Sequence, residues 1–374
     1  MLSSRHCKTN LYRLTFAELT EFLTAQGEKA YRARQIWHWM YEQRVNRFDA
    51  MTNLPGSTIA KLQASATLGS LDLVARQQSR DDTEKRLYRL HDGQFIESVL
   101  MPYDDDRMTA CISSQAGCAM GCVFCATGQM GYARNLTAGE IFEQAMVFAC
   151  ELHARGERLS NVVFMGMGEP FHNYAASLAA LRQLMDRLKI GARHITLSTV
   201  GLAPQIRRFA DEGLQVSLAV SLHKTDDAQR SALMPVNRRW GIEALLDACR
   251  YYVSRTNRRI TFEWAAIAGE NDTAEEAHRL GLLLSGLLCH VNIIPLNTTG
   301  DYAGLPAQSA SIKRFSDVLR GYGVSSTVRV RRGIDIDAGC GQLKTAVLGG
   351  KQNGKAAAAT ERARDGAAAD DRLR

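Results

Sequence analysis

Four cysteines lie close together in the stretch CISSQAGCAMGCVFCATG, which runs from Cys111 to Gly128. Three of them, Cys118, Cys122 and Cys125, have the spacing C-x3-C-x2-C. A structural zinc ion usually takes four ligands in paired C-x2-C spacings, whereas three thiolates on an iron–sulfur cubane leave one iron open for a further ligand. The spacing therefore favours a cluster, with a structural zinc site as the alternative. Cys111 stands apart from this triad.

Short polar residues follow several apolar runs further along the chain. A carboxylate in GMGEP could receive an ammonium group, and the motifs LSTVG, SLH and IPLN carry groups suited to ribose, carboxylate or adenine contacts. Capping or turn formation explains any one of these residues alone, but the set predicts a cofactor pocket. Its members are Gly168, Glu169, Ser198, Ser221, Leu222, His223 and Asn297.

The elements that must position these residues form a regular alternation. Nearly continuous apolar runs predict buried parallel strands, and amphipathic stretches predict helices between and after them. Six βα units can close into a barrel or open into a doubly wound sheet, and both place functional groups at the carboxyl ends of the strands. The predicted strands are 109–114, 161–168, 194–201, 215–223, 260–269 and 290–297; the predicted helices are 137–152, 173–188, 242–253, 274–287 and 311–323.

The ends of the chain differ from this core. Residues 1–70 are predicted to form a helical domain, because Ala33, Ile36, Trp37, Met40 and Tyr41 share one helical face. Residues 71–107 indicate a connecting β-meander with a hairpin turn at the DG pair. Residues 108–350 then form the α/β core. The tail, 351–374, has almost no large apolar residue and is predicted to stay disordered.

Composition narrows the function classes. The chain has 374 residues, 45% of them hydrophobic, and a formal net charge of +7, which suits a polyanionic partner such as nucleic acid. We find no signal-peptide pattern and no window that approaches a membrane span, so we expect a cytoplasmic protein with no membrane association. Nine cysteines in such a chain are more consistent with thiols, metal ligands or catalysts than with a disulfide framework.

The cysteine triad, with Phe124 before its last member and a strand before it, resembles the radical S-adenosylmethionine (SAM) superfamily. The resemblance narrows to the adenine-C2 RNA methyltransferases of the RlmN type. It rests on SSQAGCAMGCVFCATGQMGYARNLTAGEI, GMGEP, LSTVG, SLH, PLN and RRGIDIDAGCGQL, with YRARQIWHWMY and MTNLP near the start. It implies an α/β fold, a partial (βα)6 TIM-like barrel of the radical SAM type with a small helical N-terminal domain that binds RNA.

The resemblance also implies cofactors and roles. Cys118, Cys122 and Cys125 would hold a [4Fe-4S] cluster, and two SAM molecules would be used per turnover. Cys340 would carry the methyl group, on a loop that Gly339 and Gly341 make mobile. Cys111 would resolve the enzyme–RNA crosslink by forming a transient disulfide with Cys340. The proton of the adduct would be removed by Glu97, as the family assigns it, or by Cys111 itself.

The implied substrates are an adenosine in the peptidyl-transferase centre of 23S ribosomal RNA and the adenosine 3′ of the anticodon in certain transfer RNAs. A monomer served by an electron donor such as flavodoxin or ferredoxin is expected. Basic residues fit an RNA partner; they are Arg32, Arg34, Arg44, Arg47, Arg329, Arg331 and Arg332. Two alternatives stay open: a sister enzyme that methylates C8 of the same ribosomal adenosine and confers antibiotic resistance, and a non-catalytic RNA-binding protein with a structural metal site.

Overall fold

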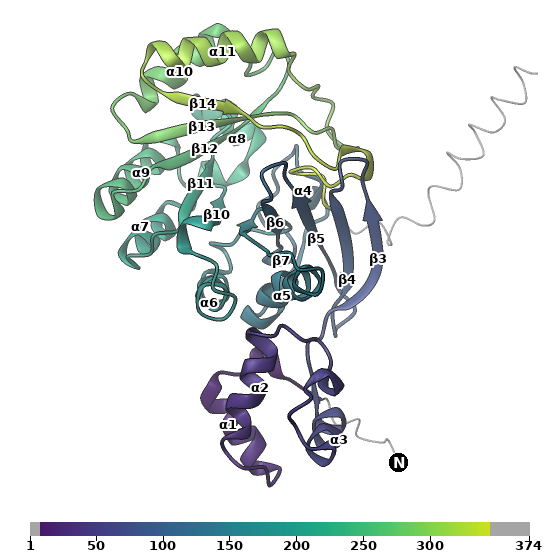
Figure 1. Ribbon diagram of the computed structural model, residues 1–374. Coiled ribbons are helices and arrows are strands. Elements are labelled where there is room, and N and C mark those ends of the chain that lie inside the picture. The colour runs from purple at the N-terminus through teal and green to yellow at the C-terminus, as the bar shows by residue number, and fades with distance from the viewer. Residues whose placement is uncertain (1–7, 345–374) are drawn as a thin grey trace, which may run out of the picture.

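The computed structural model of the chain describes residues 8–344, so the predicted disordered tail and Cys7 lie outside the described residues. A ten-stranded sheet runs through the larger part of the molecule in the order β14-β13-β12-β11-β10-β9-β6-β5-β4-β3 (Figure 1). Strands β6 and β9 to β14 pair in parallel, and β3 to β6 pair antiparallel. The sheet thus joins a parallel barrel-like part to an antiparallel extension.

All six strands expected in the parallel part are present, and a seventh, β14, was not predicted. Ser198 and Ser221 lie at the carboxyl ends of β10 and β11, whereas Glu169, His223 and Asn297 lie in loops that follow strands. Their bounds are β6 (Met108–Cys111), β9 (Asn161–Phe164), β10 (Ile195–Thr199), β11 (Ser217–Ser221), β12 (Ile260–Ala266), β13 (Cys289–Pro295) and β14 (Ser325–Val328).

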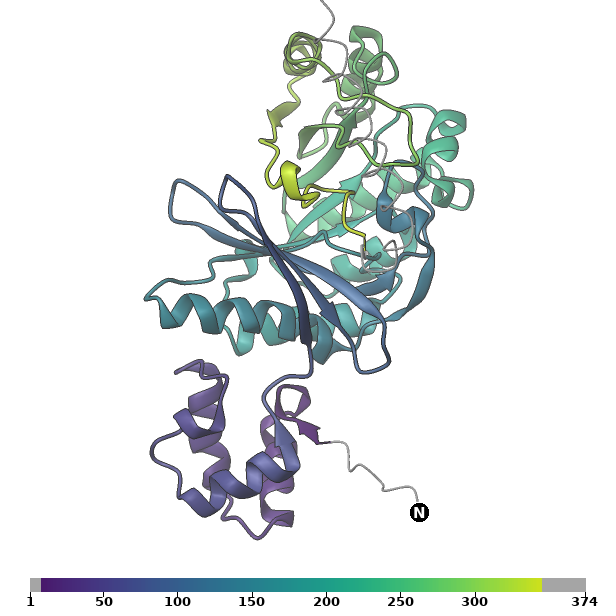
Figure 2. The ribbon, with the colours of Figure 1, turned by 90° about the vertical axis from the view of Figure 1, so that its right-hand side faces the viewer.

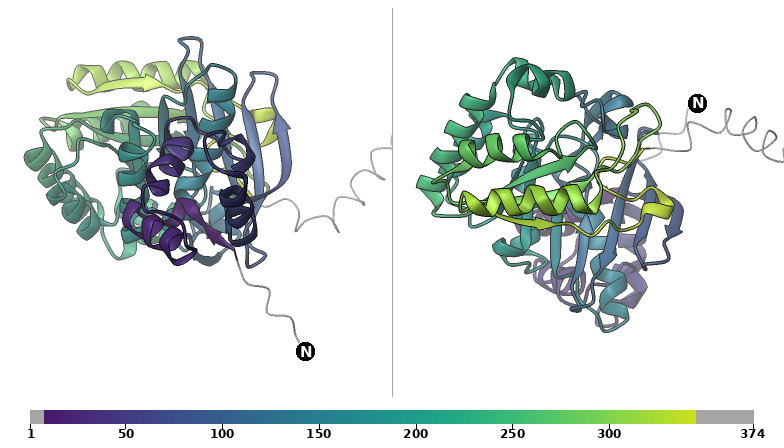
Figure 3. Two further views of the ribbon diagram at one scale, coloured as in Figure 1. Left: turned by 60° about the horizontal axis from the view of Figure 1, so that its bottom comes forward. Right: turned by 90° about the horizontal axis from the view of Figure 1, so that it is seen from above.

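Helices lie along the outer side of the curved parallel strands (Figures 1 and 3). The five predicted helices are present, and α7 and α8 are additional. Thr137 begins α5 with the capping box that its spacing from Glu140 predicts. The bounds are α5 (Ala138–Ala154), α6 (Tyr174–Asp186), α7 (Ala203–Asp211), α8 (Asp227–Leu233), α9 (Ile242–Thr256), α10 (Ala274–Leu284) and α11 (Ser309–Gly321). No helix within residues 8–344 is long and apolar enough to cross a bilayer.

Apolar side chains on both faces of the central strands form the core. Val220, Phe262, Trp264 and Ile293 are fully buried. The indole of Trp264 donates to the backbone carbonyl of Asn271, so its one polar atom is satisfied. Burial on both faces follows from helices outside and side chains of neighbouring strands inside.

The antiparallel extension is the predicted meander: β3 (Asp72–Gln78), β4 (Glu84–Arg89) and β5 (Phe95–Pro102). Asp92 and Gly93 form the turn between β4 and β5, where Gly93 has a φ of 83° that favours glycine. Figure 2 shows the C-terminal segment, in yellow, beside these strands. The meander therefore packs against the C-terminal segment, residues 337–344.

A smaller hairpin holds the cysteine triad. It pairs β7 (Gln115–Gly117) with β8 (Tyr132–Asn135), and α4 (Ala126–Gln129) lies between them. Cys118 follows β7 directly, and Cys125 is the N-cap residue of α4.

The N-terminal part is helical, with α1 (Phe16–Ala25), α2 (Arg32–Tyr41) and α3 (Gly56–Ser65) beside a short pair of strands, β1 (Thr9–Asn10) and β2 (Ala66–Thr67). Arg187, from the loop after α6, is buried against this part. Its guanidinium donates to the carbonyls of Tyr12 (2.8 Å) and Leu14 (3.0 Å) and to the hydroxyl of Tyr41 (2.9 Å). These bonds attach the helical part to the α/β core.

Candidate active site

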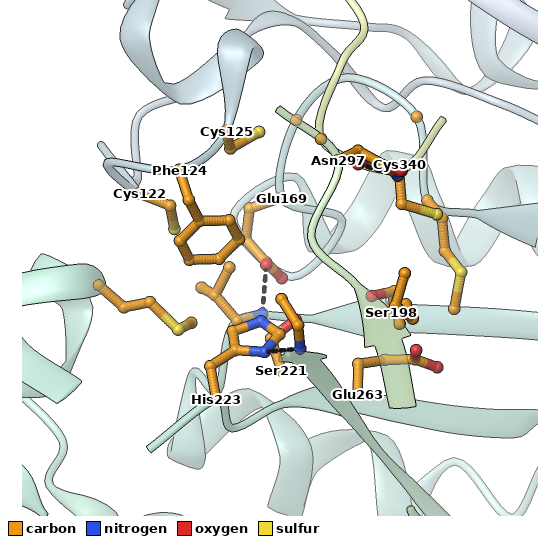
Figure 4. Close-up of a pocket in the computed structure, with 18 of the residues that line it drawn as sticks. Cys122, Phe124, Cys125, Glu169, Ser198, Ser221, His223, Glu263, Asn297 and Cys340 are labelled. Carbon is orange, nitrogen blue, oxygen red and sulfur yellow. Dashed lines mark hydrogen bonds between the residues drawn. The ribbon is translucent and has the colours of Figure 1, made fainter. Parts of the chain in front are cut away.

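A cavity opens at the carboxyl ends of the parallel strands, the position that the strand-end motifs predict. Figure 4 shows side chains from the cysteine loop, the strand ends and the C-terminal segment around it. Most of the predicted cofactor residues line it, among Cys122, Phe124, Cys125, Gly168, Glu169, Ser198, Ser221, His223, Glu263, Asn297, Arg329 and Cys340. The fold thus brings together residues that are more than 200 positions apart.

The cysteine triad lies at one side of this cavity. Cys122 and Cys125 line it, whereas Cys118 does not, and the backbone N–H of Cys118 donates to the carbonyl of Gly131. Burial raises the pKa of all three thiols, which is expected where nothing compensates a thiolate. Phe124 packs edge-on against His223, with ring centroids 5.0 Å apart.

Within residues 8–344 no three His, Cys, Asp or Glu side chains converge closely enough to hold a single metal ion. A cubane binds its thiolates on separate irons, so its ligands need not meet at one point. Three thiols from one short loop, two of which line the cavity, fit a cubane with three protein thiolates, whereas a structural zinc ion usually takes four ligands.

Glu169 is a buried residue in the cavity wall, and backbone donors hold its carboxylate. One carboxylate oxygen accepts from the N–H of Phe171 (2.9 Å) and the other from Val200 (2.8 Å, Figure 4). Burial raises the pKa of Glu169 to about 7, so a cation at this place would stabilise its charged form. The preceding Gly168 has a φ of 102° and packs against Gln115.

His223 and Asn297 line the cavity and offer it one hydrogen-bond donor and one acceptor, respectively. The Nδ1 atom of His223 accepts from the N–H of Ala265 (2.9 Å), and burial lowers its pKa to about 3, so the ring is neutral and Nε2 carries the proton. Asn297 donates to the carbonyl of Cys340 (3.1 Å), while its buried Oδ1 has no donor within residues 8–344. Such an orphaned acceptor at a cavity wall fits a bound cofactor with donor groups.

Leu222 does not reach the cavity. Side chains alternate along an extended segment, so Ser221 and His223 face the cavity while Leu222 is fully buried on the other side. Its carbonyl accepts from Arg230, and its N–H donates to the carbonyl of Glu263.

Arg230 is a residue that the sequence analysis missed. It is fully buried and donates to the carbonyls of Val200 (2.8 Å), Ser221 (2.9 Å) and Leu222 (3.1 Å). It therefore ties the loop after β10 to the loop after β11. A single arginine in the helical stretch DAQRSAL carries no sequence signal for this role.

Glu263 was also missed, although it faces the cavity from β12 (Figure 4). It accepts from the amide of Asn292 (2.8 Å), and burial raises its pKa. A lone carboxylate inside the apolar strand ITFEWAAIAG was the signal that could have identified it.

A second, smaller cavity adjoins the first. Cys111 lines it together with Met101, Tyr103 and the arginines 329, 331 and 332, and Cys340 lines both cavities. Burial raises the pKa of Cys111 to about 12; the sulfur of Cys340 adds to this effect and Arg329 opposes it. Both cysteines are free thiols. Cys340, the predicted methyl carrier, thus lies between the two cavities, and Cys111, the predicted resolving thiol, lies in the second one.

Glu97 lines neither cavity. It lies on β5 behind the C-terminal segment, where one oxygen accepts from the N–H of Lys344 (3.0 Å) and the other is 3.6 Å from Nζ of Lys85. Burial raises the pKa of Glu97 to about 7, and the charge of Lys85 opposes this rise.

The sequence is similar to known protein families in two regions and to individual proteins along most of its length. Residues 9–68 match the ribosomal RNA large subunit methyltransferase N-terminal domain, and residues 112–281 match the radical SAM superfamily. The chain is 52% identical over 341 residues to the dual-specificity RNA methyltransferase RlmN 1 of Myxococcus xanthus, covering 90% of this chain and 95% of the relative. It is 46% identical to the probable dual-specificity RNA methyltransferase RlmN 2 of Opitutus terrae, covering 90% of this chain and 87% of the relative.

A solved structure is also similar. The crystal structure of a radical SAM methyltransferase from Sphaerobacter thermophilus superposes with a TM-score of 0.86 at 50% identity, covering 90% of this chain and 99% of that one.

Proposed function

Because the chain belongs to the RlmN family of radical SAM dual-specificity RNA methyltransferases, we propose that it methylates C2 of two kinds of adenosine. One lies in the peptidyl-transferase centre of 23S ribosomal RNA, and the other lies 3′ of the anticodon in transfer RNAs. The methyl group passes through Cys340, and a transient disulfide between Cys340 and Cys111 releases the product.

Membership of the superfamily implies a [4Fe-4S] cluster and SAM. Cys118, Cys122 and Cys125 would hold the cluster, and the polar groups of Glu169, Ser198, Ser221, His223 and Asn297 would hold SAM. Bound there, SAM and the cluster would supply a methyl group, an electron and a radical that abstracts hydrogen. Glu169 offers a carboxylate for an ammonium group, and the Nε2–H of His223 offers one donor.

The position of Cys340 is the observation that carries this proposal. Both the methyl group of SAM and C2 of adenine are electrophilic, so direct transfer fails and a sulfur nucleophile must carry the carbon. Cys340 lines both the cavity of the predicted cofactor residues and the cavity of Cys111. A group on its sulfur therefore needs only a short movement to pass from one cavity to the other.

Release requires a thiol near the crosslink and a base. Cys111 shares the second cavity with Cys340, so its thiolate can attack the Cys340 sulfur once the adduct has lost the C2 proton. The S–S bond forms as the bond between that sulfur and the transferred carbon breaks, and the carbon takes up a proton to become the methyl group. A pKa near 7 suits Glu97 as the base that removes the proton from C2. Because the N–H of Lys344 donates to the carboxylate of Glu97, the C-terminal segment must shift before this carboxylate can reach an adenine bound in the second cavity.

Positively charged side chains around the second cavity would attract the phosphate backbone of RNA. Arg331 and Arg332 line this cavity, and the helical N-terminal part, which we propose as an accessory RNA-binding domain, carries further basic residues. The target adenine must leave its stack to reach Cys340, as for other enzymes that act on a nucleobase.

The test is anaerobic reconstitution with iron, sulfide and SAM, followed by mass spectrometry of nucleosides from both RNA substrates. We expect 2-methyladenosine in both. Exclusive formation of 8-methyladenosine would instead assign the C8 activity, and bound zinc without any methylation would favour the non-catalytic alternative.

A further inference from the structure

The segment from Asp337 to Lys344, which carries Cys340 near its middle, is hydrogen-bonded along its length. Besides the bond from Asn297 to the Cys340 carbonyl, the N–H of Ala126 donates to the carbonyl of Gly341 (2.7 Å) and the hydroxyl of Thr127 to that of Leu343 (2.6 Å). These bonds hold the middle of the segment on the cofactor side. Its two ends contact the opposite wall, formed by the meander.

Both ends meet the same pair of charged residues. Nζ of Lys85, on β4, donates to the carbonyl of Asp337 (3.3 Å). Glu97, on the neighbouring strand β5, accepts from the N–H of Lys344 (3.0 Å). The charged ends of Lys85 and Glu97 are 3.6 Å apart, and both side chains are almost fully buried, at 8% and 3% exposed.

Neither Lys85 nor Glu97 has another ion-pair partner within residues 8–344. A buried charge that loses its partner is unfavourable, so each residue needs the other. Hydrogen bonds to charged groups are also stronger than those between neutral groups. The pair is therefore well suited to fix the two ends of segment 337–344.

We propose that the buried Lys85–Glu97 ion pair clamps both ends of segment 337–344 and thereby positions Cys340 between the two cavities. Lys85 is a positioning residue, since it lines neither cavity. Loss of the negative charge on Glu97 weakens both contacts together, so the two ends are released as a unit. The inference rests on the proposed function only in taking Cys340 as the reactive thiol.

Hydrogen–deuterium exchange of the full-length protein, measured on peptides that cover 337–344, tests the clamp without any assay of activity. In Lys85→Met we expect these amides to exchange about tenfold faster or more, the effect of losing one charge-assisted hydrogen bond. The double variant Lys85→Met with Glu97→Gln leaves no unpaired charge, so it should recover overall stability and keep the fast local exchange.

Lys224→Met is the matched control. Lys224 is likewise buried, and its Nζ donates to the carbonyl of Glu270 (2.9 Å) and lies 3.9 Å from the carboxylate of the same residue. It should speed exchange around itself and leave 337–344 unchanged. Because Lys224 adjoins His223, this control is read by exchange and not by activity.

Unchanged exchange of 337–344 in both Lys85 variants would overturn the clamp. Equal acceleration of this segment by Lys85→Met and Lys224→Met would overturn it as well, since the effect would then be general. In a single turnover, Lys85→Met should keep its cluster yet methylate Cys340 about tenfold more slowly. A wild-type protein that never methylates Cys340 would contradict the proposed function and leave the exchange result intact.

Discussion

Gly168 offers a direct test of how tightly the cavity is built around the predicted cofactor residues. A Cβ at this position would lie 2.5 Å from Cβ and 2.7 Å from the backbone nitrogen of Gln115, and φ is +102°. The left-handed conformation costs an alanine about 1–2 kcal/mol, and overpacking costs about 1–3 kcal/mol more. We therefore expect Gly168→Ala to lower the free energy of unfolding by about 2–5 kcal/mol, which leaves a protein of ordinary stability folded.

The variant Gly156→Ala separates the cost of the backbone conformation from the cost of overpacking. Gly156 has a φ of +76° and no atom within 4 Å of an added Cβ, so this variant carries the backbone cost alone. Urea unfolding of both variants gives the difference. Because Gln115 also accepts the N–H of Glu169 (2.8 Å), Gly168→Ala should weaken SAM binding while Gly156→Ala does not. Equal losses of stability in the two variants would refute the close packing of Gln115 on Gly168.

Three further predictions follow from the site and from the N-terminal attachment. Cys340→Ala should retain its cluster by iron analysis and lose methylation, whereas Cys111→Ala should accumulate a covalent RNA adduct visible on a denaturing gel; normal product release by Cys111→Ala would contradict the disulfide step. Affinity for SAM should fall as the pH drops through about 7, where burial places the pKa of Glu169, because only the carboxylate attracts an ammonium group. Calorimetry of Glu169→Gln should show weak binding without that pH dependence. Arg187→Ala should cost about 2–4 kcal/mol, since it leaves buried carbonyls unpaired, and should speed proteolysis within residues 9–68.

The six parallel strands from β6 to β13 could be predicted from the sequence, because apolar runs and helical periodicity are local signals; their order in the sheet comes from the structure. Strand β14 could not. Its four residues, SSTV, are mostly exposed and form no apolar run, so only pairing with β13 defines it. Long-range hydrogen bonding thus decided an element that local propensity leaves undetermined.

Some residues of the candidate site could likewise be predicted from the sequence, and others could not. The cysteine triad could be predicted as a set of cluster ligands from its spacing and its place after a strand, since its residues are contained in eight consecutive positions. The contacts of Glu97 and the buried position of Leu222 could not be predicted, because they depend on which face of a strand meets which distant segment. Arg230 bonds only to backbone carbonyls and one amide, and such partners leave no pattern in a single sequence.

The bonds from α4 to the C-terminal segment have a consequence for biosynthesis. Synthesis runs from the N-terminus, so Cys118, Cys122 and Cys125 leave the ribosome more than 200 residues before Gly341 and Leu343, whose carbonyls bond to α4. The cysteine loop thus exists in the nascent chain while that side of the cavity is still open. A chain that stopped before Asp337 would keep every predicted cluster ligand and lack the segment that closes over them. The cavity is therefore complete only after the segment that carries Cys340 has been synthesised.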